Sequence, residues 1–188
     1  RHPGVEVLAI TVVAGNVPLD QAVQNALYVV ELAGADVAVH AGRAAPLVIP
    51  LRTAQFVHGQ DGMGDIGLPV SGRVPAPGDA VDVLVDTIRR SEPGTLTLVT
   101  LGPLTNVAVA FTRDPSLATQ LREIVVMGGT ADAVGNVSAV AEFNIWVDPE
   151  AAAIVYGSGA RITQVGWDIS RKYATITPAV STNKPVIH

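Results

Sequence analysis

Runs of apolar, β-branched residues alternate along this chain with segments whose apolar residues recur at helical spacing. The first run extends from Val5 to Val13 and turns at Ala14-Gly15-Asn16. Pro18 then occupies a suitable first helical position, apolar residues follow at helical spacing, and Gly34 ends the element. A short apolar run at 37–39 predicts the second strand. The order of elements is therefore strand, helix, strand.

The alternation stops between His40 and Gly78, where glycine and proline recur, and it resumes afterwards. A loop of this length in a compact domain is usually functional or mobile. Beyond it, the same patterns predict strands at 95–101, 123–127 and 161–167, and helices at 79–90, 104–111 and 149–156. The tail from Arg171 to His188 predicts no element.

Several of the predicted strands are near-continuous apolar runs rather than strict alternations of apolar and polar residues. Such strands are typical of a parallel sheet that helices cover on both faces, because neither face meets water. The sequence therefore predicts a single α/β domain over residues 1–188, with a doubly wound, mostly parallel sheet and helices on both faces. Ligands of such sheets bind at the carboxyl ends of the strands. Asn16, Gly102 and Gly128-Gly129 follow predicted strands and mark this edge.

Composition narrows the class of protein. Hydrophobic residues make up 48% of the 188 residues and charged residues 15%, so the chain can bury a large core and is not a disordered or coiled-coil protein. The net charge of −5 predicts no partnership with nucleic acid or an acidic membrane surface. No run of about 18 uncharged apolar residues predicts a membrane span. The absence of cysteine excludes disulfides and zinc–thiolate sites, and it is compatible with the cytoplasmic location that we expect.

Three loops each allow two interpretations. Asn16 fits an ordinary turn after a strand as well as a ligand contact. His58, among the glycines and acids of 57–64, is either a solvent-exposed imidazole or part of a loop that folds over a ligand and donates a proton to a leaving group. In the segment 101–106, Thr105 or Asn106 caps the next helix, or the carbonyl at the strand end points into the crevice and binds a hard cation.

The segment from Gly135 to Asn144 is the most distinctive. Glu142 and Asn144 are two residues apart, so in an extended segment their side chains point the same way. A carboxylate accepts hydrogen bonds and an amide both donates and accepts, which suits recognition of vicinal hydroxyls. The adjacent Asp148-Pro149-Glu150 instead predicts a helix N-terminus capped by Asp148. Met127-Gly128-Gly129 lacks the glycine spacing of a dinucleotide site, so a Rossmann-type oxidoreductase is a distant alternative.

Together these motifs resemble the inosine-uridine preferring nucleoside hydrolases in order and approximate spacing, over residues 4 to about 170. The segments that carry the resemblance are Val13-Ala14-Gly15-Asn16, His58-Gly59, Asp61-Gly62-Met63-Gly64, Gly102-Pro103-Leu104-Thr105-Asn106, Met127-Gly128-Gly129, Gly135-Asn136, Glu142-Phe143-Asn144 and Asp148-Pro149-Glu150-Ala151-Ala152. The resemblance implies hydrolysis of the N-glycosidic bond of ribonucleosides to ribose and free base. It also implies a calcium ion that holds the ribose hydroxyls and a water, since calcium accepts many oxygen ligands in irregular geometry.

The resemblance also assigns roles to residues. Met127 packs beside the sugar, the backbone carbonyl of Leu101 binds calcium, and His58 is an auxiliary catalytic residue near the base. The ribose-contacting residues are Asn16, Asn136, Glu142 and Asn144. The implied partner is a ribonucleoside substrate, and the implied assembly is a homodimer or homotetramer. Base preference does not follow from these motifs.

Two parts of the family pattern have no counterpart in these residues. An aspartate cluster of the form D-x-D-x-G-x-D-D, which contains the general base and several calcium ligands, belongs on a strand before Val5. A His-Asp pair belongs tens of residues after Trp167. Because the chain begins with Arg1 rather than methionine, we expect a longer gene product and a fold that is incomplete at both ends. The alternative is a non-catalytic ribose- or nucleoside-binding remnant that has lost its metal site.

Overall fold

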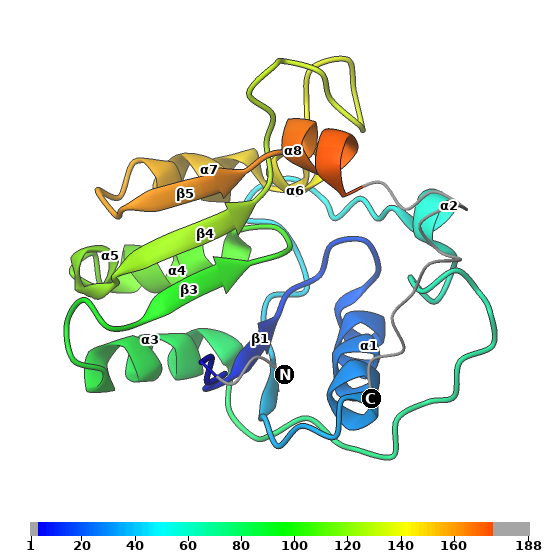
Figure 1. Ribbon diagram of the computed structural model, residues 1–188, viewed down its shortest axis with the longest axis horizontal. Helices are drawn as coiled ribbons and strands as arrows, with labels where there is room; N and C mark the ends of the chain where they lie inside the picture. The colour runs from blue at the N-terminus through cyan, green and yellow to red at the C-terminus, as the bar shows by residue number, and fades with distance from the viewer. Residues whose placement is uncertain (1–3, 175–188) are drawn as a thin grey trace.

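The strands of this protein pair in parallel throughout the computed structural model, which describes residues 4–174. β1 (Ile10–Val12) pairs with β2 (Val39–Ala41). β4 (Glu123–Met127) lies between β3 (Thr97–Thr100) and β5 (Ile162–Val165). The predicted α/β class with parallel strands is confirmed (Figure 1). Within the described residues, however, the strands form two sheets, of order β1-β2 and β3-β4-β5, rather than one.

Helices connect the strands in chain order. The predicted helices are α1 (Leu19–Leu32), α3 (Ala80–Arg90), α4 (Thr105–Arg113) and α7 (Pro149–Tyr156). Four shorter ones were not predicted: α2 (Gln55–His58), α5 (Leu117–Gln120), α6 (Phe143–Val147) and α8 (Trp167–Tyr173). The tail beyond residue 174 lies outside the described residues. None of the helices within residues 4–174 combines the length and apolar character that crossing a bilayer requires.

Side-chain caps set the starts of two predicted helices. Asp79 precedes α3 and accepts a hydrogen bond from the backbone N–H of Val81 at 2.9 Å. Asp148 precedes α7 and accepts one from the backbone N–H of Ala151 at 3.0 Å, with Pro149 at the first helical position. Both caps satisfy a backbone donor that the helix leaves unpaired. The predicted cap at Asp148 is confirmed.

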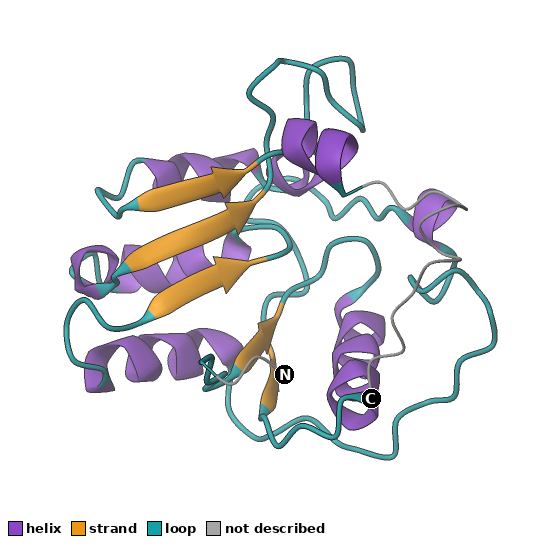
Figure 2. Ribbon diagram, viewed as in Figure 1, coloured by secondary structure: helices purple, strands orange, loops and turns teal. Residues whose placement is uncertain are grey.

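Two apolar cores hold the helices against the sheets. α3, α4 and α7 pack against the inner face of β3-β4-β5, where Ile124 and Val126 are fully buried. α1 packs against β1 and β2, which lie between α1 and α3 (Figure 2). Helices therefore cover both faces of the smaller sheet. The described helices cover one face of the larger sheet, and on its other face Val99 is 57% exposed.

The first two strands differ from their predicted limits. β1 is confined to Ile10–Val12, whereas Val5, Val7 and Leu8 are exposed and do not form a strand. β2 begins at Val39, two residues later than predicted. A strand exists only where a neighbouring strand takes its hydrogen bonds, and among residues 4–174 β1 has β2 alone as a partner. An apolar pattern by itself therefore overestimates the length of β1.

Asn106 joins α4 to the smaller sheet, β1-β2. Its side chain is 3% exposed and stands at the second residue of α4. The Nδ2 group donates to the carbonyl of Val12 at 3.0 Å, and Oδ1 accepts from the backbone N–H of Arg43 at 2.9 Å. The interpretation of Thr105 or Asn106 as the helix cap is wrong: Leu104 holds the cap position, and both side chains reach other segments instead.

Replacing Asn106 by alanine is expected to lower the free energy of unfolding by about 2–4 kcal/mol, because each buried backbone group left unpaired costs about 1–3 kcal/mol. Urea unfolding of the complete protein measures the loss. Asn25→Ala is the matched control, since that amide bonds to a single backbone group, the carbonyl of Asp61, and otherwise accepts only from the side chain of Gln21. Its expected cost is about 1 kcal/mol or less. Equal losses at the two positions would contradict the linking role of Asn106.

Candidate functional site

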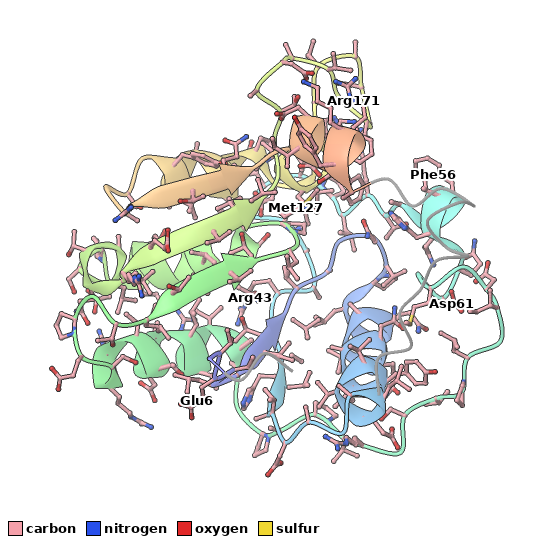
Figure 3. All side chains as sticks on the ribbon, viewed as in Figure 1. Glu6, Arg43, Phe56, Asp61, Met127 and Arg171 are labelled. Atoms are coloured by element: carbon pink, nitrogen blue, oxygen red, sulfur yellow. The ribbon has the colours of Figure 1, made fainter. Side chains whose placement is uncertain are left out.

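Asn144 joins the carboxyl ends of two neighbouring strands to the start of α6. Its Nδ2 group donates to the carbonyl of Met127, at the end of β4, at 3.1 Å, and lies 3.4 Å from the carbonyl of Leu101, just after β3. The same nitrogen lies 3.2 Å from the sulfur of Met127. Figure 3 labels Met127 at this edge of the sheet. Three residues predicted from separate motifs thus meet at one point.

The orientation of the Asn144 amide follows from these contacts. The side chain is 8% exposed, and its two Nδ2 hydrogens face two carbonyl groups. Within residues 4–174, Oδ1 accepts no hydrogen bond. The amide oxygen Oδ1, on the opposite side of the amide from Nδ2, is therefore available to accept a hydrogen bond from a ligand.

Glu142 lies beside Asn144 and is only 2% exposed. It is the N-cap of α6: Oε1 accepts from the backbone N–H of Asn144 at 3.0 Å, and Oε2 accepts from that of Ile145 at 3.3 Å. Oε2 also accepts from the backbone N–H of Gly129 at 2.9 Å. The carboxylate therefore ties the turn after β4 to the start of α6.

The expectation that Glu142 and Asn144 lie on an extended segment is wrong. Asn144 is the second residue of a helix, and Glu142 precedes it as the cap. The two side chains are neighbours because the carboxylate folds back onto the first turn of the helix. A glutamate is a weak signal for a helix start, since Ser, Thr, Asp and Asn are the usual N-cap residues.

Asn136 reaches the same place from the loop between β4 and α6. Its Oδ1 accepts from the backbone N–H of Phe143 at 2.9 Å, which leaves its Nδ2 group to donate elsewhere. Gly135 permits this turn, because an added Cβ would lie 2.3 Å from the carbonyl oxygen of Ala141. The pairing of Gly135 with Asn136 in the motif thus has a steric reason.

The loop that carries Asn136 is anchored on α8. Asp168 accepts a hydrogen bond from the backbone N–H of Ala131 at 3.0 Å, and Arg171, which Figure 3 labels, forms an ion pair with Asp132 at 2.5 Å. The hydrogen bond from the hydroxyl of Thr130 is the largest cause that lowers the pKa of Asp132, and the positive charge of Arg171 lowers it to a smaller extent. Sequence reasoning missed these anchors because they join residues almost 40 positions apart.

Asn16 is exposed on the loop after β1, and its neighbours place it near the Leu101 turn. Gly15 packs on Pro103, where an added Cβ would lie 2.9 Å from the ring Cδ. The carbonyl of Asn16 accepts from the backbone N–H of Ala54 at 2.9 Å. Ala54 in turn belongs to a small apolar cluster with Phe143 of α6. Asn16 therefore belongs to the same edge of the fold.

His58 lies apart from this cluster. It ends α2, its side chain is exposed, and α2 is set away from the ends of β3 and β4 (Figure 1). The loop after it is held internally: Asp61 accepts from the backbone N–H groups of Met63 and Asp65. Backbone hydrogen bonds from Asp61 and Gln60 lower the pKa of Asp65. No contact within residues 4–174 joins the imidazole to Glu142 or Asn144.

A cavity of about 460 Å³ opens beside Glu142. Ile145 and Gly129 line it together with Tyr156 and Gln164, which the sequence did not single out. The hydroxyl of Tyr156 lies 3.2 Å from Oε1 of Gln164. Burial, and then the negative charge of Glu142, raise the pKa of Tyr156. Of the residues that the sequence predicted to contact the ribose, Glu142 lines this cavity, whereas Asn16, Met127, Asn136 and Asn144 do not.

The donor atoms at this edge do not by themselves fit a calcium ion. The carbonyl of Leu101 is a hard but neutral oxygen. Among residues 4–174, no three His, Cys, Asp or Glu side chains gather as metal ligands. Calcium takes about 6–8 oxygens, usually with several carboxylates among them. The described residues thus offer part of a ligand set at most.

Comparison with known proteins gives consistent matches. The family model described as inosine-uridine preferring nucleoside hydrolase matches residues 1–186. The chain is 43% identical over 181 residues to the inosine-uridine preferring nucleoside hydrolase of Leishmania major, covering 95% of this chain and 57% of that protein. It is 45% identical over 173 residues to uridine nucleosidase 1 of Arabidopsis thaliana, covering 90% of this chain and 51% of that protein.

A solved structure of a plant nucleoside hydrolase also matches, with a TM-score of 0.85 and 41% sequence identity. The match covers 90% of this chain and 54% of the plant protein. The chain thus spans somewhat more than half the length of the relatives that it matches.

Proposed function

This chain belongs to the inosine-uridine preferring nucleoside hydrolase family, and on that basis we propose that it carries the ribose-binding part of an enzyme that hydrolyses ribonucleosides to ribose and free base. The observation that carries the proposal is the junction at the ends of β3 and β4. There Asn144 is held between the carbonyls of Leu101 and Met127, with Glu142 beside it.

Asn144 is suited to accept a hydrogen bond from a sugar hydroxyl. Its Nδ2 group is fixed by two backbone carbonyls, so Oδ1 is presented in one orientation before any ligand arrives. A group that is oriented in advance loses little conformational freedom on binding. We assign to Asn144 the most direct contact with the ribose.

Glu142 and Asn136 complete the polar surface that we propose for the sugar. A carboxylate has about four lone-pair sites, and three backbone N–H groups occupy sites on Glu142. We assign its remaining capacity to a sugar hydroxyl, which can donate to it. Asn136 offers its Nδ2 group as a donor. Met127 gives the sugar an apolar neighbour.

We further propose that the reaction depends on calcium, with the carbonyl of Leu101 as one ligand. Support comes from the position of this hard oxygen at the strand end, where ligands of parallel sheets bind. Because the described donors do not complete a calcium site, we assign no step of the reaction to the ion and no general base to these residues. His58 as an auxiliary residue, the homo-oligomer and the cytoplasmic location stay predictions.

Discrimination against 2′-deoxyribonucleosides tests the ribose contacts. We expect the complete protein to release ribose from uridine and inosine, and to cleave the 2′-deoxy analogues with a kcat/KM lower by about 5- to 150-fold, as the loss of one hydroxyl contact predicts. A reducing-sugar assay measures both. Equal rates would remove the proposed recognition of the diol. A complete protein that binds ribonucleosides without cleaving them would support the non-catalytic alternative.

A further inference from the structure

Asp148 does more than begin α7. Its side chain is completely buried and accepts three hydrogen bonds from three segments. Oδ1 accepts from the backbone N–H of Ala151, at the start of α7. Oδ2 accepts from the backbone N–H of Leu47 at 3.0 Å, in the loop after β2, and from the hydroxyl of Thr105 at 2.6 Å, at the start of α4. A helix cap needs only the first of these bonds.

The bond to Thr105 closes a ring of contacts around the proposed ribose site. From Leu101 the chain runs four residues to Thr105, whose hydroxyl bonds to Asp148. From Asp148, α6 runs back four residues, about one helical turn, to Asn144. The Nδ2 group of Asn144 then returns to the carbonyl of Leu101 at 3.4 Å, the longest contact in the ring. Both connecting segments are short, and Thr105 and Asp148, which the hydrogen bond joins, are buried, so each contact constrains the other.

We propose that Asp148 is a positioning residue for the ribose site, acting through the hydroxyl of Thr105. The bond fixes α6 relative to the turn after β3, and so sets where Asn144 meets the carbonyls of Leu101 and Met127. The assignment rests on the proposed function, because it concerns the geometry of the proposed ribose contact. Without the bond, Asp148 still caps α7. The hydrogen bond that holds the end of α6 to the start of α4 is then missing, so α6 can shift relative to the turn after β3.

Two substitutions at Thr105 separate positioning from packing. Thr105→Val keeps the volume of the side chain and removes the hydroxyl, whereas Thr105→Ser keeps the hydroxyl and removes a methyl group from a buried position. Packing alone predicts that the serine variant is the more impaired. Positioning by the hydrogen bond predicts that the valine variant is the more impaired. Thr112→Val is the control, because Thr112 is on the same helix and its hydroxyl donates only to the carbonyl of Ala108.

The experiment measures the complete protein in two ways: kcat/KM for uridine, and the NMR signals of the Asn144 side-chain amide, identified by their loss in Asn144→Asp. We expect Thr105→Val to shift these signals and to lower kcat/KM by about tenfold or more, since displacements near 1 Å reduce rates by such factors. Thr105→Ser and Thr112→Val should resemble the unmodified protein in both measurements.

Unchanged Asn144 signals in Thr105→Val would overturn the proposal, and so would a serine variant as impaired as the valine variant. Unfolding curves of all three variants show whether each is folded under the assay conditions. If the unmodified protein releases no ribose, the proposed function fails, and the amide signals alone still decide whether Asp148 positions Asn144.

Discussion

Replacing Asn144 by alanine is expected to lower kcat/KM for ribonucleosides by about 100-fold, toward the upper end of the range for a lost hydrogen bond to a reacting ligand. The substitution removes the acceptor proposed for the sugar. It also removes the donor that faces the carbonyls of Leu101 and Met127. Steady-state kinetics with uridine measure the loss, and far-UV circular dichroism and urea unfolding establish that the variant is folded.

Asn144→Asp sharpens this test, because it keeps an acceptor and replaces the donor with a second, negatively charged oxygen. A carboxylate cannot donate to the two carbonyls, so the fixed orientation is lost while the side chain keeps its size. We expect a loss comparable with that of the alanine variant. Asn25→Ala, whose amide also bonds to a backbone carbonyl, is expected to stay close to the unmodified rate. Activity within threefold in both Asn144 variants would exclude the proposed ribose contact.

Variants of Glu142 are less informative than those of Asn144. A residue that only contacts a ligand can be removed without harm to the fold, and the sequence suggested such a role for Glu142. In the structure its carboxylate receives three backbone N–H groups and begins α6. Loss of an N-cap alone costs about 0.5–2 kcal/mol. A fall in activity of a Glu142 variant would therefore mix lost binding with a displaced helix.

The sequence predicted the grouping of most of the site, because a parallel sheet brings the ends of its neighbouring strands together. Leu101 and Met127 each end a predicted strand, and these two predictions correspond to the adjacent strands β3 and β4. Glu142 and Asn144 were predicted as neighbours from period-2 geometry. They are neighbours for a different reason, since α6 begins between them. The prediction was correct about the residues and wrong about the backbone.

Other features depend on contacts that no local pattern contains. Thr105 and Asn106 stand where helix caps are common, yet Thr105 bonds to Asp148, 43 residues away, and Asn106 bonds to Val12, 94 residues away. The length of β1 likewise depends on how many of its residues find a partner strand. Local propensity describes what a segment prefers, and tertiary contacts decided these cases.

Chelation of divalent cations is expected to abolish ribose release by the complete protein, and added calcium to restore it. Retained activity after rigorous chelation would end the proposal of calcium dependence. The carbonyl of Leu101 is the one calcium ligand proposed here, and a carbonyl ligand does not depend on its side chain, which is 77% exposed. Leu101→Thr should therefore keep both activity and calcium dependence. A Leu101→Thr variant that no longer requires calcium would contradict this prediction, because the side chain of Leu101 would then contribute to the calcium dependence.

Residues 1–188 alone should bind calcium with a Kd weaker than about 1 mM and should not hydrolyse uridine, because affinity for calcium depends on how many carboxylate oxygens a site provides. Within the described range, acidic side chains do not gather into a ligand group, and Asp148 and Glu142 already accept backbone hydrogen bonds. Calorimetric titration with calcium, followed by a reducing-sugar assay, measures both properties. Micromolar binding with turnover would require a carboxylate set elsewhere in these residues, and the assignment of Leu101 would then be wrong. Weak binding here together with calcium-dependent activity of the complete protein would place the missing carboxylates outside residues 1–188.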